Sequence, residues 1–183
     1  RIKTTIHSMS TANIMTSVEN GVVDIGIGYL FERTEQFETS VLYYDTFELV
    51  VSPEHPLAEC SHVSFEQLRN IPLIAMTPET AVRKFMDQIF KKLDIVPQVV
   101  MELSSSEEVK RMAELNLGAA IVSKASLSEE LRRGTLKMIP VPELELSHPV
   151  GVIYKSGRYL NKAMRQFLRD LKGMPEEHFM GSE

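Results

Sequence analysis

The chain has 183 residues, of which 43% are hydrophobic and 25% charged, and its formal net charge is −5. These values are typical of a globular α/β protein with its own core, and they exclude a low-complexity chain or a strongly basic nucleic-acid surface. The one cysteine excludes an intramolecular disulfide and no apolar run approaches the ~20 residues of a membrane span, so we expect a cytoplasmic protein.

The first fifty residues predict a strand, a helix and further strands. Arg1–Ile6 is typical of a strand, and Asn13–Asn20 has the apolar spacing of a helix that ends before a glycine. Val22–Gly28 is a short apolar run, which predicts a buried strand of a parallel sheet and hence a βαβ unit. Val41–Tyr44 and Phe47–Ser52 predict two more strands.

A change of composition then marks a boundary between subdomains. Residues 53–64 contain two prolines and several polar turn formers, as is typical of a connection. We therefore place the boundary near Ser52. The first predicted subdomain comprises residues 1–52 and 149–183, and the second comprises residues 53–148.

Strand and helix patterns alternate through the rest of the chain. This alternation predicts an α/β fold with a second parallel sheet. The predicted strands are Leu73–Met76, Gln98–Leu103, Ala119–Ser123 and Val150–Tyr154, and the predicted helices are Ala81–Leu93, Ser106–Asn116, Leu127–Arg132 and about 160–172.

The helix predicted at 81–93 is strongly amphipathic. Its apolar side has the spacing of a surface helix packed on a sheet, and consists of Val82, Phe85, Met86, Ile89 and Leu93. Its charged side, which includes Arg83 and Lys84, is expected to be a solvated face.

No motif in the sequence predicts catalysis or metal binding. The five histidines lack metal-ligand spacing, and Gly26-Ile27-Gly28 lacks the third glycine and following helix of a phosphate loop. There is also no Gly-x-Ser-x-Gly nucleophile motif. We therefore expect no enzyme, no metal and no cofactor.

Hydroxyl side chains recur where predicted strands end and helices begin, at 8–11, 77–80 and 104–106. Ligands of α/β sheets bind outside the carboxyl ends of the strands, where helix N-terminal amides bind anions. Helix capping explains any single hydroxyl equally well, and Ser105 with Glu108 has the spacing of a capping box. Arg33 is either an anion-binding residue or an exposed loop arginine.

Several of these segments, in this order, resemble the effector-binding domain of LysR-type transcriptional regulators from about Arg1 to Leu171. The resemblance is carried by Gly21-Val22-Val23-Asp24-Ile25-Gly26-Ile27, Leu49 to Ala58 with His55-Pro56-Leu57-Ala58, Leu68 with Pro72, Leu117-Gly118-Ala119-Ala120-Ile121-Val122, and Arg133-Gly134-Thr135-Leu136.

The resemblance implies two Rossmann-like subdomains of periplasmic-binding-protein type II, joined by two crossover strands. It also implies a small effector, an organic anion, in a cleft between them, a homodimer or homotetramer, and DNA binding through a separate N-terminal winged helix-turn-helix. By the same resemblance, the first subdomain lacks its first strand and helix. An upstream segment is expected.

Carried over residue by residue, the resemblance implies effector contacts at Ser10, Thr11, Thr77, Pro78, Glu79, Thr80, Ser104 and Ser105. The helix at 81–93 is the candidate interface between copies of the chain. Two alternatives remain, namely a periplasmic-type solute-binding protein and an enzyme built on the same cleft.

Overall fold

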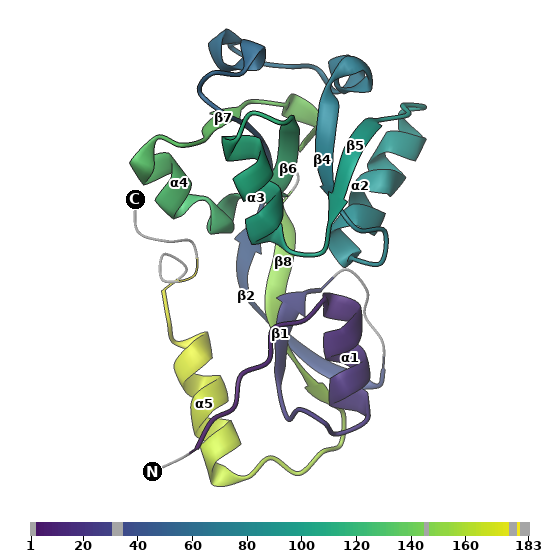
Figure 1. Ribbon diagram of the computed structural model, residues 1–183. Coiled ribbons are helices and arrows are strands. Elements are labelled where there is room, and N and C mark those ends of the chain that lie inside the picture. Colours follow the sequence, from purple (N-terminus) through teal and green to yellow (C-terminus); the bar gives the residue numbers. More distant parts are fainter. Residues whose placement is uncertain (1–2, 31–34, 145–146, 176–178, 180–183) are drawn as a thin grey trace. The chain divides into compact units, whose positions relative to one another are not determined.

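The computed structural model describes residues 3–30, 35–144, 147–175 and 179. It divides into two compact units. Among the described residues, the first contains the chain up to Tyr44 together with residues from 148 to 179, and the second contains residues between 45 and 147. This organisation agrees with the predicted α/β fold of two subdomains, each with its own sheet (Figure 1).

The first unit is built on a three-stranded sheet. Its elements are helix α1 (Thr11–Glu19), strands β1 (Gly26–Tyr29), β2 (Phe37–Asp45) and β8 (His148–Lys155), and helix α5 (Lys162–Lys172). The strand order is β1-β8-β2, and β1 runs antiparallel to β8 with Gly28 opposite Gly151. The prediction that this strand belongs to a parallel sheet is therefore wrong. A short apolar run is typical of a covered strand of either direction, so the sequence did not distinguish them.

The predicted opening strand and its βαβ unit are also not formed. Residues 3–10 have no regular secondary structure, and the side chain of Ile6 is 89% exposed. A strand is stable only when its backbone groups pair with a neighbour. Residues 3–10 pair with no strand in the described part of the chain.

The second unit is built on a five-stranded mixed sheet. Its elements are β3 (Phe47–Val51), β4 (Pro72–Met76), α2 (Ala81–Lys92), β5 (Gln98–Leu103), α3 (Ser106–Glu114), β6 (Ala119–Ser123), α4 (Ser128–Arg133) and β7 (Lys137–Ile139), with short 3-10 turns η1 (Pro56–Glu59), η2 (Phe65–Asn70), η3 (Lys124–Ser126) and η4 (Pro142–Leu144). The strand order is β5-β4-β6-β3-β7. β4 is parallel to β5 and β6, whereas β3 is antiparallel to β6 and β7. The predicted parallel sheet is thus correct only for β5, β4 and β6.

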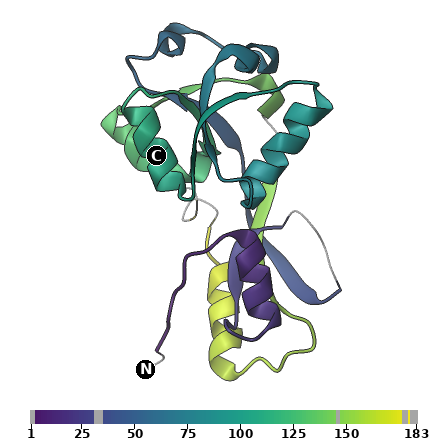
Figure 2. The same ribbon diagram turned by 45° about the vertical axis from the view of Figure 1, so that its right-hand side comes forward.

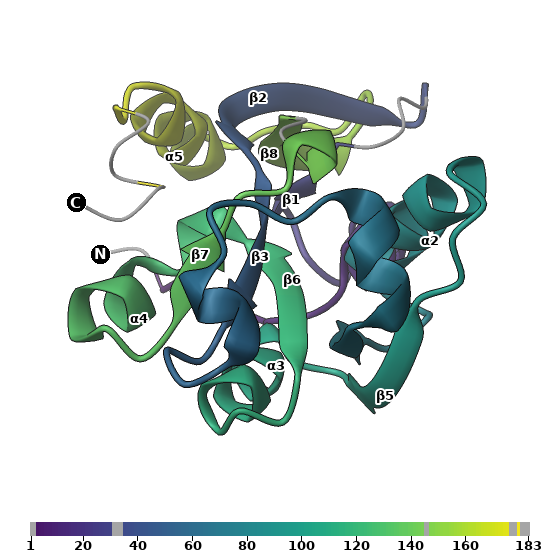
Figure 3. The same ribbon diagram turned by 90° about the horizontal axis from the view of Figure 1, so that it is seen from above.

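Helices cover both faces of this second sheet. Figures 2 and 3 show α2 on one face and α3 on the other. On the α3 face, Val109 and Ala113 pack against Ile74 and Ala120 in a fully buried cluster. Because both faces are covered, the strands have the continuous apolar sequence that predicted them.

The chain enters the second unit earlier than the predicted boundary near Ser52. Leu49, Val50 and Val51 are fully buried, and their strand β3 pairs with β6 and β7. The division between the units lies between Tyr44 and Asp45, and again at residue 148. The proline-rich residues 53–64 connect β3 to η2 within the second unit, so the change in composition marks a loop there.

Candidate functional site

The candidate site in the second unit lies where β4 and β5 end. In the parallel register of these strands, Met76 is opposite Leu103. The Thr77 amide donates to the Leu103 carbonyl at 2.9 Å. The turns that carry Thr77 and Ser104 are therefore neighbours at the carboxyl edge of the sheet, where α/β proteins commonly bind ligands.

Thr80 serves as the N-cap of α2. Its hydroxyl accepts from the Arg83 amide at 3.3 Å and donates to the Thr77 carbonyl at 2.9 Å. The hydroxyl proton is therefore already used within the protein. Between the two predicted roles of this residue, the geometry favours helix capping.

Thr77, Ser104 and Ser105 differ from Thr80 in this respect. Their hydroxyls have no hydrogen-bond partner within the described ranges, and Ser104 is exposed while the other two are half-buried. Ser105 occupies the N-cap position of α3 but makes no side-chain cap, so the predicted capping box with Glu108 is wrong. These three hydroxyls remain available to a ligand.

Pro78 and Glu79 lie in the turn between Thr77 and Thr80, and both are exposed. The first turns of α2 and α3 begin directly beside them and beside Ser105. Helix N-termini carry free amides and a partial positive charge, so this edge suits a ligand with hydroxyl or anionic groups.

Ser10 and Thr11 lie in the first unit, at the start of α1. Ser10 is the N-cap of this helix, and its hydroxyl accepts from the Asn13 amide at 3.4 Å. Thr11 packs beside Gly28, where an added Cβ would lie 3.3 Å from the threonine Oγ1. Ser10 therefore has a capping role, and the absence of a side chain at Gly28 leaves room for Thr11 where α1 packs on β1.

Sequence reasoning missed a polar cluster at the end of β6. The Asp45 carboxylate, which is only 1% exposed, accepts from the Ser123 hydroxyl at 2.5 Å and from the Ala125 amide at 3.2 Å. An acidic residue inside the apolar stretch before Phe47 was the only signal, and it does not identify a partner so far along the chain.

A second missed cluster joins α3 to the turn after β6. Lys110 is only 4% exposed. Its ammonium contacts Glu107 at 2.9 Å, Glu130 at 2.8 Å and the Ser126 carbonyl at 2.7 Å. Burial lowers the pKa of Lys110 by desolvation, but hydrogen bonds to Glu130 and Glu107 outweigh this effect and raise the pKa above its usual value.

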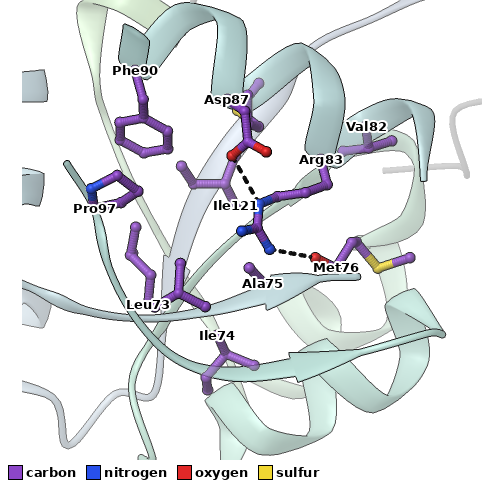
Figure 4. A pocket seen from close by; sticks show the side chains of 12 residues that line it. Leu73, Ile74, Ala75, Met76, Val82, Arg83, Asp87, Phe90, Pro97 and Ile121 are labelled. Carbon is purple, nitrogen blue, oxygen red and sulfur yellow. Dashed lines mark hydrogen bonds and ion pairs between the residues drawn. The ribbon is translucent and has the colours of Figure 1, made fainter. Parts of the chain in front are cut away.

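A small apolar cavity of about 30 Å³ lies under α2 in the second unit (Figure 4). Leu73, Phe90 and Val99 are among its lining residues. A benzene-sized cavity is several times larger, at about 150 Å³, so this space suits a water-sized group and not an effector.

Arg83 lines one side of this cavity. The prediction that Arg83 belongs to a solvated face of the helix is therefore wrong. Its side chain is 15% exposed and contacts Asp87 and Glu102, each at 2.8 Å. It also donates to the Met76 carbonyl at 2.8 Å. Burial lowers the pKa of Arg83, but the bonds to the two carboxylates raise it overall.

Arg33, which the sequence analysis considered as an anion-binding residue, lies outside the described residues. Within the described ranges, no three histidine, cysteine or acidic side chains are placed to hold a metal ion. The same ranges contain no helix that is both long and apolar enough to span a membrane.

Comparisons with known proteins assign a family. The model of the LysR substrate binding domain matches residues 1–174. The chain is 29% identical to a probable RuBisCO transcriptional regulator of Nostoc sp., covering 91% of this chain and 51% of the relative. It is 30% identical to one of Synechocystis sp., covering 88% and 49%. The chain thus spans about half the length of these curated relatives.

Solved structures show the same fold. The CcmR regulatory domain of Synechocystis PCC6803, in complex with 2-PG, has a TM-score of 0.81 at 21% identity and covers 89% of this chain and 78% of that one. The effector binding domain of QuiR, in complex with shikimate, has a TM-score of 0.79 at 19% identity and covers 90% and 77%. The chain therefore belongs to the LysR substrate-binding domain family, and its fold is that of the regulatory domains of LysR-type transcriptional regulators.

Proposed function

We propose that this chain is the effector-sensing part of a cytoplasmic LysR-type regulator and binds a small organic anion. The observation that carries the proposal is the set of uncommitted hydroxyls at Thr77, Ser104 and Ser105 on one edge of the second sheet. The family match favours this function over a periplasmic-type solute-binding protein. Effector binding would shift the regulator between two states with different DNA affinity, with DNA bound by a separate winged helix-turn-helix.

The proposed roles depend on whether each hydroxyl already makes a hydrogen bond within the protein. Thr77, Ser104 and Ser105 donate directly to the effector, and the N-terminal amides of α2 and α3 accommodate its negative charge. Thr80 and Ser10 act as helix caps that hold these turns in place. Pro78 and Glu79 shape the turn, and Thr11 is the candidate contact in the first unit.

The proposal is tested by ligand binding to the purified chain. The probes are 2-PG and shikimate, which similar regulators bind in solved structures, and a panel of other phosphorylated and carboxylated metabolites. A ligand at 100 times its Kd should stabilise the folded state by about 2.7 kcal/mol, which a thermal melt detects. Absence of binding to any member of a broad panel would contradict the proposal.

Matched variants then locate the site. Thr77→Val and Ser105→Ala each remove one donor to a charged ligand and should weaken binding by about tenfold or more. Ser128→Ala is the control, since Ser128 is exposed in α4 and its side chain makes no hydrogen bond within the described residues. Equal affinity of all three variants and the parent chain would remove these hydroxyls from the site.

We also propose that the regulator is a homodimer or homotetramer and that α2 contributes to the interface. Phe85 packs against Phe47 with ring centroids 5.9 Å apart, so it supports the core. Exposed apolar side chains lie instead at the C-cap of α2, in the loop that follows it and on the edge strand β5, namely Leu93, Val96 and Val100. Val96→Lys, at a site 77% exposed, should weaken assembly in light scattering, and at a dilution where the parent chain is monomeric both chains should melt at the same temperature.

A further inference from the structure

A continuous chain of hydrogen bonds crosses the second unit from Asp45 to the first turn of α3. It begins at the first residue after the chain leaves the first unit. Asp45 is 1% exposed, and its two carboxylate oxygens accept separately from the Ser123 hydroxyl and the Ala125 amide. A buried carboxylate that accepts from two groups of one turn fixes the position of that turn.

The turn at 123–126 carries the chain of contacts onward. The Ser126 hydroxyl donates to the Ser123 carbonyl at 2.8 Å, and the Lys124 amide donates to the Thr46 carbonyl at 2.9 Å. The Ser126 carbonyl accepts from the Lys110 ammonium at 2.7 Å. This turn is therefore held by Asp45 and Thr46 on one side and by Lys110 of α3 on the other.

Lys110 completes the connection to the candidate site. An ammonium has three donors, and here they reach Ser126, Glu107 and Glu130. Glu107 lies in the first turn of α3, two positions after Ser105. Ser105 makes no side-chain capping bond. Lys110 instead links the first turn of α3, through Glu107, to the Ser126 carbonyl in the turn after β6.

We propose that Asp45 is a positioning residue of the effector site, which acts through the 123–126 turn and Lys110 to place the first turn of α3. Only the statement that Ser105 meets the effector rests on the function proposed above. The coupling of Asp45 to the start of α3 is inferred from the described contacts alone. It predicts that a change at either end alters the other, because coupling between two sites is reciprocal.

Hydrogen exchange of the unliganded chain tests the coupling. The Leu127 amide, bonded to the Lys124 carbonyl at 3.0 Å, reports on the turn. The Val109 amide, bonded to the Ser105 carbonyl at 3.1 Å, reports on the start of α3. In Asp45→Ala both amides should exchange about tenfold faster, since bonds to a charged, buried acceptor are lost.

Controls separate this effect from general loosening. The Ile95 amide, bonded to the Phe90 carbonyl at 2.9 Å beyond α2, should keep its exchange rate. Ser128→Ala should change none of the three amides. If Asp45→Ala proves too unstable, Asp45→Asn and Ser123→Ala, which keep the Ala125 contact, should give smaller accelerations at the same two amides.

The reciprocal variant is Lys110→Met, which should accelerate the Leu127 amide as well as the Val109 amide. Acceleration of Leu127 without Val109 in Asp45→Ala would overturn the proposal and leave Asp45 as a local anchor of the turn. Unchanged rates at both amides would overturn it too. Failure of every ligand probe would contradict the proposed function without altering these exchange rates, so the two proposals fail separately.

Discussion

Lys110 of α3 and Glu130 of α4 form an ion pair of 2.8 Å in which the side chains are 5% and 12% exposed. One carboxylate oxygen of Glu130, Oε2, has no further partner within the described residues. A buried charge in this position depends on its partner, because without it the remaining charge is neither solvated nor neutralised.

Lys110→Met should destabilise the chain by about 3–5 kcal/mol, the usual cost of removing one member of a buried pair. Urea denaturation measures the loss. Lys92→Met is the control, because Lys92 is exposed in the last turn of α2 and should change stability only slightly. A loss as small as that of the control would mean that water solvates Glu130.

The same lysine predicts a dependence on alkaline pH. The folded-state pKa of Lys110 is raised above the ordinary 10.5, so its contribution is fully present below that value and is lost as pH rises through the folded pKa. The difference in unfolding free energy between the parent chain and Lys110→Met should therefore shrink above about pH 10.5. A constant difference from pH 8 to pH 11.5 would contradict the raised pKa.

Arg83→Met should lower stability by about 1–2 kcal/mol, because the methionine keeps the apolar stem but loses three polar contacts, two of them to carboxylates half open to solvent. Lys84→Met, at the exposed neighbouring position, is the matched control. Thermal melts of the two variants give the comparison. Equal melting temperatures would show that the Arg83 contacts add nothing measurable.

Gly26→Ala should destabilise the first unit by about 1–3 kcal/mol through overpacking. An added Cβ would lie 2.2 Å from the Ile14 Cγ2, a distance that forces α1 away from β1. Ile14→Ala removes that methyl, so the double variant should be less destabilised than the sum of the two single variants. Simple additivity in chemical denaturation would show that the two residues do not clash.

Val99→Ile should stabilise the second unit by up to about 0.8 kcal/mol, the value of one buried methylene. Val99 lines the 30 Å³ cavity under α2, which leaves room for that group. Val100→Ile is the control, because the next side chain of β5 is 49% exposed. A destabilised Val99→Ile with a neutral control would mean that the cavity is too narrow for the added carbon.

Much of the secondary structure was predictable because its signals are local. The strands Gln98–Leu103 and Ala119–Ser123 have the predicted bounds, and α2 begins at the predicted Ala81. The candidate site was predictable in part: parallel strands end on one edge, so the hydroxyls after β4 and β5 were expected to lie together. Which hydroxyls remain free was not predictable, since capping depends on local backbone geometry.

The sequence by itself determined the alternation of strands and helices, the apolar faces that pack them and the family motifs, because each of these is a pattern of neighbouring residues. Only the tertiary structure decided the direction of strand pairing, the entry into the second unit at Asp45, and the partners of Asp45, Arg83 and Lys110. The physical reason is that a buried polar group bonds to whatever the packing brings near it, and the partners Ser123, Glu102 and Glu130 are distant in sequence from the groups that they bind.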